Sequence, residues 1–512
     1  MRNMKMKNLV LYDTTLRDGA QTDGVTFSLE DKLEMIKRLS GCGFDVIEAG
    51  FPSSNPRDMK LFSEARKMGF GPKIAAFGMT SASPAKDRKI KELAGTKAGV
   101  LTVFGKSWDL HAREVLKVSL EENLRMISGT VDYLKAKGFT VFYDAEHFFD
   151  GYKSAPDYAF ATLTAASKAD AIVLCDTNGG TMPWEVDAIT REVAGKIKKP
   201  LGMHAHNDSG FALINSLIAL KNGAAHIQGT MNGLGERCGN LDWCEFLPVV
   251  SVKMGMDVGV DLGILSEFST YVQRLTGIGL PKNKPFVGES AFSHKGGIHI
   301  DAMIKNPKSY EHVDPETVGN KRFFVLSEQA GRSAIVESAK RHGYRLGKDD
   351  PAVLELMENM KAKQKFTDAE LFLLLAKKLG NKKPPFELIE YETEVRSAGN
   401  SKTEIKVKVG GETLHEIAEG VGPVHSLDMA LRKALEKFYE MKKVHLSNYR
   451  VRIINQEKAT AAKVEVFIEF RADGESWSTS DISDDIIKAS ESALVKGYKY
   501  YLLKNSNAYR AD

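Results

Sequence analysis

The sequence predicts an α/β protein whose first half is a closed (β/α)8 barrel, followed by a linker, a helical region and a C-terminal α+β domain. Two observations predict the barrel: eight short β-branched runs lie between residues 8 and 254, and helical segments separate them. A barrel of this kind needs about 250 residues. A doubly wound open sheet is the alternative, but the count of eight and the lack of a GxGxxG motif after the first run favour the barrel.

Most of the eight predicted strands are rich in the β-branched and aromatic residues that favour strands. Helix starts fall between them: Ser28 with Asp31, and Ser119 with Glu122, have the spacing of an N-cap and its capping-box partner. The strands are NLVLYD (8–13), FDVIEA (44–49), KIAAFG (73–78), GVLTVFG (99–105), FTVFYDAE (139–146), DAIVLCDT (170–177), PLGMHAHN (200–207) and AHIQGTMNG (225–233).

The second half of the chain changes character twice. Residues 276–330 are rich in Gly, Pro and Lys, which predicts an extended linker with short elements, and residues 331–384 look helical. From residue 385, two runs alternate with period two, TEIKVKV (403–409) and KVEVFIEF (463–470), and each precedes a helical segment, 427–441 and 484–500. The offset of about 60 residues predicts a repeat within one compact α+β module. We therefore expect four segments: the barrel (1–275), a linker subdomain (276–330), a helical subdomain (331–384) and a C-terminal domain (385–512).

Composition excludes several classes of protein. The 512 residues are 43% hydrophobic and 27% charged, which is an ordinary soluble profile, and a net charge of +4 is too weak to indicate nucleic acid or a membrane surface as partner. The basic start of the chain lacks the apolar core of a secretory signal, and no apolar run reaches the roughly 18 residues of a membrane span. Four scattered cysteines without a CxxC pair predict reduced thiols and a cytoplasmic location.

Polar side chains follow six of the eight predicted strands at the C-terminal end, where a barrel of this kind carries its chemistry. One such residue could cap a helix, but six strand ends that converge on one rim indicate a site. The residues are Asp13, Arg17, Asp18 and Gln21; Glu48; Asp144, Glu146 and His147; Asp176 and Thr177; His204 and His206; and Glu236, Arg237 and Asn240.

The stretch GMHAHNDSG (202–210) predicts a metal site. Residues i and i+2 of a strand point to the same side, so His204 and His206 can hold one ion. A bare pair of this kind is more often one buried and one solvated histidine, but its place on the rim favours ligands. Asp18 adds an anionic oxygen and Asn240 a neutral one. This mixed set suits Mn²⁺, Mg²⁺, Co²⁺, Fe²⁺ or Zn²⁺, and two histidines argue against a site for Mg²⁺ alone.

Two charged neighbours of this set each have two interpretations. Arg17, beside Asp18, can hold a carboxylate or a developing alkoxide. The alternative is a structural ion pair with Glu146 or Glu48. Asp208 follows the histidine pair, and either orients a histidine from behind or caps the next helix.

Several motifs resemble one family, the acyl-CoA-condensing synthases that make isopropylmalate, homocitrate and citramalate. DTTLRDGAQ, IEAGFPSSNPRD, HAHND and GERCGN are typical of the whole family. The resemblance covers nearly the whole chain, and GVGPVHSLDMAL (420–431) is similar to the family's regulatory domain. The stretches most similar to the family's citramalate group are FGKSWDLH (104–111), FYDAEHFFDG (142–151), LCDTNGGT (174–181) and NKPFVGESAFSHKGGIHIDA (283–302).

The resemblance implies a role for each matching residue. One position departs from the pattern: Asp144 is charged where some relatives place a group that shapes the substrate pocket. The implied metal ligands are Asp18, His204, His206 and Asn240, with Mn²⁺ or Mg²⁺ as the first candidates and Zn²⁺ or Co²⁺ as the alternatives. Arg17, Glu146 and Thr177 match substrate-contacting positions, and His299, Asp301 and Tyr310 match positions that complete the site at the acetyl-CoA side.

The implied reaction is a Claisen-type condensation of acetyl-CoA with pyruvate, followed by hydrolysis to (R)-citramalate and CoA, in isoleucine biosynthesis. Arg17 would hold the alkoxide, His299 is the candidate base, and Glu146 would hold water or the methyl side of the substrate, or act as an alternative base. Phe77 or Phe104 would limit the size of the keto acid. Isoleucine is the implied feedback effector, bound by the C-terminal domain of a homodimer.

Three alternatives stay open. A 2-isopropylmalate synthase, or another synthase of the family with a bulkier keto acid, shares the barrel motifs. A lyase of related barrel type breaks a carbon–carbon bond instead, but such lyases usually lack a module like residues 385–512. A non-catalytic amino-acid sensor or scaffold is disfavoured by the intact polar rim.

Overall fold

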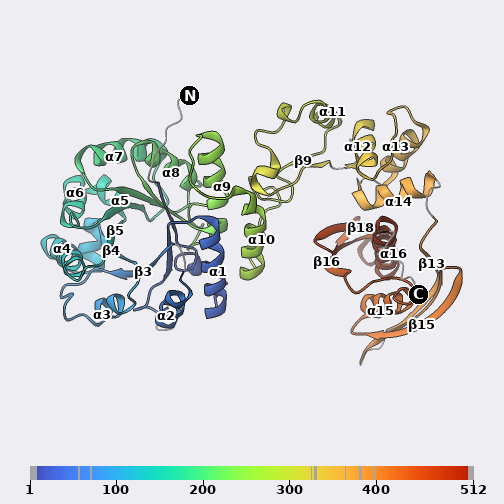
Figure 1. Ribbon diagram of the computed structural model, residues 1–512, viewed down its shortest axis with the longest axis horizontal. Helices are drawn as coiled ribbons and strands as arrows, with labels where there is room; N and C mark the ends of the chain where they lie inside the picture. The colour runs from blue at the N-terminus through green and yellow to red at the C-terminus, as the bar shows by residue number, and fades with distance from the viewer. Residues whose placement is uncertain are drawn as a thin grey trace. The chain divides into compact units, whose positions relative to one another are not determined.

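The computed structural model divides into two compact units, Met1–Phe292 with Val313–Lys321, and Ser293–His312 with Arg322–Asp512 (Figure 1). Asn8, the first residue of the first predicted strand, lies outside the described part of the chain. The structure describes residues 9–55, 58–69, 72–324, 326–327, 331–363, 365–379, 383–395, 397 and 399–505.

Eight parallel strands close the barrel of the first unit, because β1 pairs with both β2 and β8. Each described strand lies on one of the eight predicted runs, so the barrel is confirmed and the open sheet is wrong. The strands are β1 (Val10–Asp13), β2 (Val46–Gly50), β3 (Lys73–Met79), β4 (Val100–Lys106), β5 (Val141–Glu146), β6 (Ala171–Asp176), β7 (Leu201–Ala205) and β8 (His226–Gly229).

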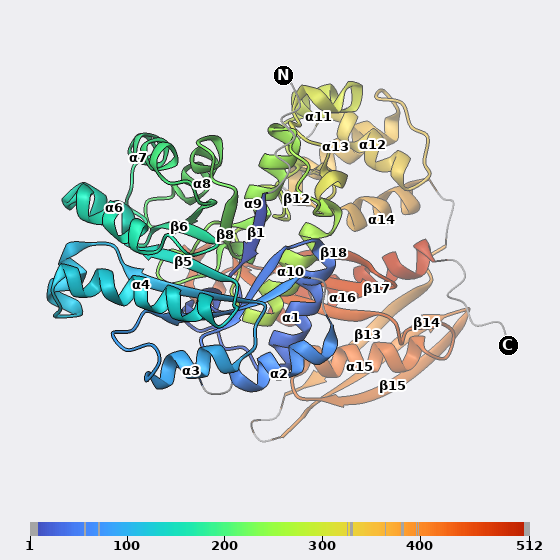
Figure 2. The same ribbon diagram turned by 60° about the vertical axis from the view of Figure 1, so that its left-hand side comes forward.

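Helices lie outside the ring of strands and connect each strand to the next (Figures 1 and 2). At the first of them, Ser28 Oγ accepts a hydrogen bond from Asp31 N (3.1 Å) and Asp31 accepts one from Ser28 N (2.9 Å), which is the predicted capping box. The connecting helices are α1 (Leu29–Cys42), α2 (Asp58–Met68), α3 (Arg88–Gly95), α4 (Leu120–Ala136), α5 (Phe148–Ser154) with α6 (Pro156–Ala165), α7 (Pro183–Lys196) and α8 (Ala212–Lys221); α9 (Trp243–Pro248) and α10 (Leu265–Thr276) follow β8.

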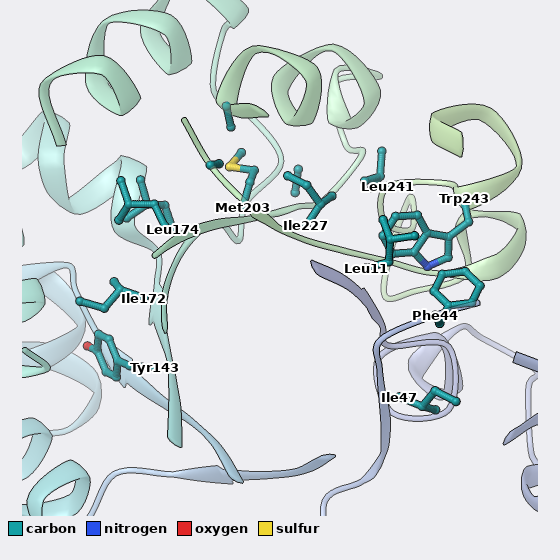
Figure 3. Packing of buried hydrophobic residues seen from close by; sticks show 14 of the residues in the cluster. Leu11, Phe44, Ile47, Tyr143, Ile172, Leu174, Met203, Ile227, Leu241 and Trp243 are labelled. Atoms are coloured by element: carbon teal, nitrogen blue, oxygen red, sulfur yellow. The ribbon is translucent and has the colours of Figure 1, made fainter. Parts of the chain in front are cut away.

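The main core of the barrel lies between the strands and the helices. Figure 3 shows Tyr143, Leu174 and Met203 pointing out of the ring of strands toward the helices, and all three are buried. Burying such a side chain fully stabilises the fold by about 1.5–3 kcal/mol. Alternate strand positions point inward, where Tyr12 and Phe142 belong to a smaller apolar cluster. The strand ends above that cluster carry polar groups.

The second unit begins with β9 (Ser293–His294) and helix α11 (Gly297–Lys305). Ile300 on α11 packs in one buried cluster with residues of the next three helices, which are α12 (Arg332–Arg341), α13 (Pro351–Lys363) and α14 (Asp368–Lys378). Three short strands lie between these helices: β10 (Phe323–Phe324), β11 (Leu326–Ser327) and β12 (Lys365–Phe366).

The C-terminal part of the second unit consists of two halves with the same order of elements. The first half is β13 (Phe386–Glu394), β14 (Ser401–Val409), β15 (Glu412–Gly420) and α15 (Pro423–Leu435); the second is β16 (His445–Ile453), β17 (Val464–Ala472), β18 (Glu475–Ser483) and α16 (Ile486–Lys504). Among the described helices, α16 included, none is long and apolar enough to span a membrane.

This arrangement confirms the repeat and corrects its details. The two predicted strands are β14 and β17, but a further strand separates each from its helix, and α15 begins and ends earlier than predicted. β14 and β17 are the middle strands of three-stranded antiparallel sheets, whereas the other four strands are edges. β14 alternates regularly between buried and less buried positions, and edge strand β16 is mostly exposed. The missed strands therefore carry a weak hydrophobic pattern.

Candidate active site

Three predicted ligands converge at the C-terminal end of the barrel. His204 Nε2 lies 3.3 Å from Asp18 Oδ2 and 3.3 Å from His206 Nε2. Ligand atoms of the three residues lie within 4.8 Å of one another, and all three residues are buried. Two ring nitrogens and a carboxylate oxygen therefore face one point, as the strand spacing predicts.

The backbone of Asn240 lies next to this cluster, and its side-chain oxygen is available as an acceptor. Its backbone forms an isolated antiparallel bridge with His206. Asn240 Nδ2 donates to the carbonyl of Leu234 (3.1 Å), while Oδ1 is buried and accepts no hydrogen bond from the residues described. Gly235 permits this packing, since a Cβ there would come within 2.2 Å of Asn240 Nδ2. The same loop carries Cys238, which is exposed, whereas the other three cysteines are buried.

The electrostatics of the cluster fit a divalent cation. Burial raises the pKa of Asp18, but Arg17 and the histidines outweigh it and hold that pKa well below its usual range. Burial lowers the pKa of His204, but the Asp18 carboxylate outweighs it and raises that pKa. Burial and the neighbouring His204 lower the pKa of His206 to about 4. Asp18 is thus held ionised and His206 neutral, which are the states that metal ligands require, and His204 would release its proton when an ion binds.

Arg17 is fixed beside the cluster. Its Nε donates to Glu48 Oε2 (2.6 Å), its Nη1 lies 3.5 Å from Asp18 Oδ2, and its guanidinium carbon lies 3.8 Å from the centre of the Phe77 ring. Burial lowers the pKa of Arg17, but Glu48 and Asp18 outweigh it, so the group stays charged. The alternative that we considered, an ion pair with Glu48, is present, and it leaves Arg17 in place to act on a substrate.

A buried network of polar side chains lies inside the barrel beneath the rim. Tyr12 Oη donates to Glu48 Oε1 (2.7 Å) and lies 2.7 Å from Thr102 Oγ1. Gln228 Nε2 donates to Asp144 Oδ1 (3.2 Å). Burial, with the charge of Glu48, raises the pKa of Asp144 to about 7. Asp144 is therefore a buried carboxyl group on the inside of the barrel.

Glu146 pairs with a residue that we did not predict. Lys106 ends β4, Glu146 ends β5, and the two are Cα partners in the parallel register. The Lys106 ammonium forms a close ion pair with Glu146 Oε2, and the two side chains are 12% and 23% exposed. The signal was available in the sequence, because Lys106 stands at the end of the fourth strand, one of the two strand ends to which we assigned no polar group.

Three phenylalanines form an aromatic cluster between the two cations. Phe77 and Phe104 stack with ring centres 5.1 Å apart, and Phe51 meets both rings edge-on, at 5.5 and 6.3 Å. Arg17 lies over Phe77, and Lys106 Nζ lies 5.5 Å from the centre of Phe104. The cluster supplies an apolar surface next to two fixed positive charges.

Thr177 and Asp208 form hydrogen bonds with other residues of the rim. Thr177 Oγ1 accepts a hydrogen bond from His147 N (2.8 Å), and its carbonyl accepts one from Arg237 Nη2 (2.8 Å). Asp208 forms two hydrogen bonds with Arg237, at 2.8 and 2.9 Å. Both interpretations of Asp208 are therefore wrong, because its partner is an arginine 29 positions away and neither a histidine nor a helix end.

The remaining predicted residues belong to the second unit. His299 on α11 is exposed and stacks on Tyr310, with ring centres 4.3 Å apart. Asp301 is held by Ser333 (2.8 Å), Lys305 (2.7 Å) and Lys348 (2.6 Å), and these hydrogen bonds keep the pKa of Asp301 well below its usual range. The structure thus brings His299 and Tyr310 together, and separately assembles the barrel set.

Three family descriptions cover the chain in order. Residues 8–272 match the HMGL-like family. Residues 286–366 match the homocitrate synthase post-HMGL domain, and residues 365–502 match the LeuA allosteric (dimerisation) domain. Enzymes of the HMGL-like family depend on a divalent metal, and this chain has a buried Asp–His–His cluster of the kind that holds one.

Full-length relatives narrow the family. An (R)-citramalate synthase of Geobacter sulfurreducens is 44% identical over 98% of this chain and 98% of its own. The (R)-citramalate synthase of Aquifex aeolicus is 43% identical with the same coverage. The chain belongs to the citramalate synthase family. A probable 2-isopropylmalate synthase of Methanopyrus kandleri is a more distant member of the wider family, 32% identical over 95% of this chain and 97% of its own. The predicted resemblance is confirmed.

Proposed function

We propose that this chain condenses acetyl-CoA with pyruvate and water to form (R)-citramalate and CoA, a step toward isoleucine. The observation that carries the proposal is the Asp18–His204–His206 cluster beside Arg17, in a chain whose full-length relatives are citramalate synthases. A new bond joins the acetyl methyl carbon to the keto carbon, one methyl proton is removed, and water cleaves the thioester.

Asp18, His204, His206 and Asn240 are the residues that would hold a divalent cation, Mn²⁺ or Mg²⁺ first. Such an ion supplies Lewis-acid polarisation of a 2-keto acid. The free Oδ1 of Asn240 and the facing Nε2 atoms support this assignment. The protein's part is to keep these donors dry and fixed, and all four are buried at the C-terminal end of the barrel.

Arg17 has the geometry to stabilise negative charge on the reacting keto oxygen. Glu48 and Phe77 fix the guanidinium before any substrate binds, so no reorganisation is needed when charge develops. The neighbouring aromatic cluster of Phe51, Phe77 and Phe104 fits the small methyl group of pyruvate. We expect a branched side chain to overlap with one of these rings.

Two groups are available for proton transfer. We assign His299 as the base that removes the methyl proton, because its ring is exposed and oriented by stacking on Tyr310. Glu146 would hold the attacking water, or take the proton itself. Thr177 supports this part of the rim by holding the backbone of His147.

The C-terminal domain supports regulation by a small ligand in a homodimer, since it belongs to the LeuA allosteric (dimerisation) family. Isoleucine is the effector that we propose, because citramalate leads toward it. Regulation requires two states and a ligand that prefers one of them.

A thiol-release assay tests the proposed function. The purified chain, loaded in turn with Mn²⁺ and Mg²⁺, is given acetyl-CoA and one of pyruvate, 2-ketobutyrate, 2-ketoisovalerate or 2-ketoglutarate. Pyruvate should give the highest kcat/KM and a product of R configuration, with modest discrimination against 2-ketobutyrate, because one methylene changes kcat/KM by about 10- to 200-fold. Better turnover with 2-ketoisovalerate would assign the chain to leucine synthesis instead.

A further inference from the structure

Lys106 and Glu146 are brought together by the barrel itself. They are the last residues of adjacent parallel strands and are partners in the register, two positions beyond the partners Phe104 and Asp144. Because strand residues two apart point to the same side, Lys106 and Glu146 share the inward side of the barrel with Asp144. The pair therefore belongs to the top inward layer of the barrel, where the candidate site lies.

The backbone around this pair is held on both sides. Ser107 N donates to the carbonyl of Glu146 (3.0 Å), which extends the β4–β5 pairing past the end of the strands. Asn123, fully buried on α4, donates through Nδ2 to the carbonyl of Lys106 (2.8 Å). The Ser107 hydroxyl is 2.9 Å from Thr162 Oγ1. A lysine side chain is usually mobile, but here its attachment point is fixed.

The ion pair leaves the carboxylate with hydrogen-bonding capacity. The ammonium of Lys106 contacts the buried Glu146 Oε2, whereas Oε1 accepts no hydrogen bond from the part of the chain that the structure describes, and the side chain is 23% exposed. Its charge is compensated, while an acceptor remains for a proton on a ligand or a water. A group that must bind water or accept a proton requires this combination.

We propose that Lys106 is a positioning residue for Glu146: its ammonium holds the carboxylate in place and aimed at the reacting atoms. This inference rests on the proposed function only in so far as Glu146 takes part in the reaction. Lys106 acts through Glu146 and makes no contact with the keto acid. The rim thus has an ion pair on each side of the aromatic cluster, because Arg17 is paired with Glu48 and Asp18 on the other side.

The test begins with Lys106→Met and Lys106→Arg in the full chain. Lys106→Met should lower kcat at least tenfold, change the KM for the keto acid less than threefold, and move the acidic side of the kcat/KM profile to higher pH. Lys106→Arg keeps a cation and should recover most of the activity. The matched control is Lys135→Met, which removes a lysine paired with Asp170 at 2.8 Å on α4. That variant should retain the parent's kcat and pH profile.

A double-mutant cycle keeps the proposal falsifiable if Lys106→Met is poorly folded. In a Glu146→Gln background, Lys106→Arg and Lys106→Gln should have little further effect on kcat, because residues that act as a unit are not additive. An equal loss in both backgrounds would overturn the proposal. So would a tenfold rise in the KM for the keto acid at unchanged kcat, which indicates direct contact with the substrate anion.

This outcome is separable from that of the proposed function. All variants are measured with whichever keto acid the parent chain uses best. If that is not pyruvate, the proposed substrate is wrong, while the comparison of Lys106 variants still decides the role of Lys106.

Discussion

The barrel rim and helix α11 carry the two sets of proposed site residues, and they hold their side chains very differently. On the rim, His204, His206 and Asp18 are buried and face one another within 4.8 Å. On α11, His299 is exposed, and its ring contact is with Tyr310, which is itself 46% exposed. A preformed set of ligands can bind a small chelating molecule without rearrangement, whereas an exposed group becomes fixed only against another surface.

This difference predicts that ligand binding and the rate of reaction depend on different residues. The rim should determine whether metal and keto acid bind, and the second unit should determine how fast the bound keto acid reacts. A substitution in one set should then leave the function of the other set unchanged. The experiments on His206, His299 and the effector test this independence.

The largest effect is expected at the rim. His206→Ala removes a ligand, so metal content should fall and turnover should drop to background, a larger loss than the roughly 10- to 100-fold seen when a residue behind a ligand is removed. Metal content is measured by elemental analysis alongside the thiol-release rate. His415→Ala, an exposed histidine on β15, is the control and should match the parent. Full activity in a chelator-stripped sample of the parent would contradict the metal role.

The next largest effect is expected on α11. His299→Ala should lower kcat by about 10²- to 10⁴-fold, the usual contribution of a general base. Metal content and keto-acid affinity, measured by calorimetry with pyruvate, should stay at the parent's values because the rim is intact. If His299→Ala also loses metal, the rim does not bind metal independently of the second unit, and the proposed separation is wrong.

An effector of the second unit should act on rate and not on metal binding. Isoleucine, added to the full-length protein, should inhibit about 5- to 150-fold, the range of typical coupling free energies of 1–3 kcal/mol. Leucine and valine, titrated separately, show whether the effect is specific. If none of the three inhibits at millimolar concentration, the domain serves dimerisation alone.

The smallest effect concerns Asp144 and stability. Burial and then Glu48 raise its pKa to about 7, so the protonated form favours folding. That contribution is fully present below the unfolded pKa of about 3.9 and is lost as the pH rises through about 7. Asp144→Asn stays neutral and should lose less stability than the parent between pH 5 and pH 8, by up to about 3 kcal/mol.

Thermal unfolding of the parent and Asp144→Asn at the two pH values measures this difference. Asp132→Asn, a surface change on α4 at a residue paired with Lys168, is the control. An identical stability difference between parent and Asp144→Asn at pH 5 and pH 8 would show that Asp144 does not titrate in this range.

The sequence predicted the barrel well because every barrel strand is short and mostly buried, and each run was visible alone. Edge strands such as β16 were missed since their exposed residues need no hydrophobic alternation. The rim ligands were predictable because strand ends of a barrel meet at one place. Lys106 carries the same strand-end signal and was overlooked, whereas the Arg237–Asp208 pair was not predictable, because it depends on a partner that the fold brings close from 29 positions away in the chain.

The exposed thiol in the loop that carries Asn240 has a practical consequence for these assays. Cys238 is exposed and three other cysteines are buried. A disulfide reagent that reports released CoA will also titrate this thiol, giving a burst of one equivalent per chain that is independent of turnover. A burst above one equivalent per chain would reveal unfolded protein, whose other three thiols also react, and Cys238→Ser removes the burst from folded chains. Because the label would sit two residues from Asn240, a coupled assay without a thiol reagent should accompany every rate.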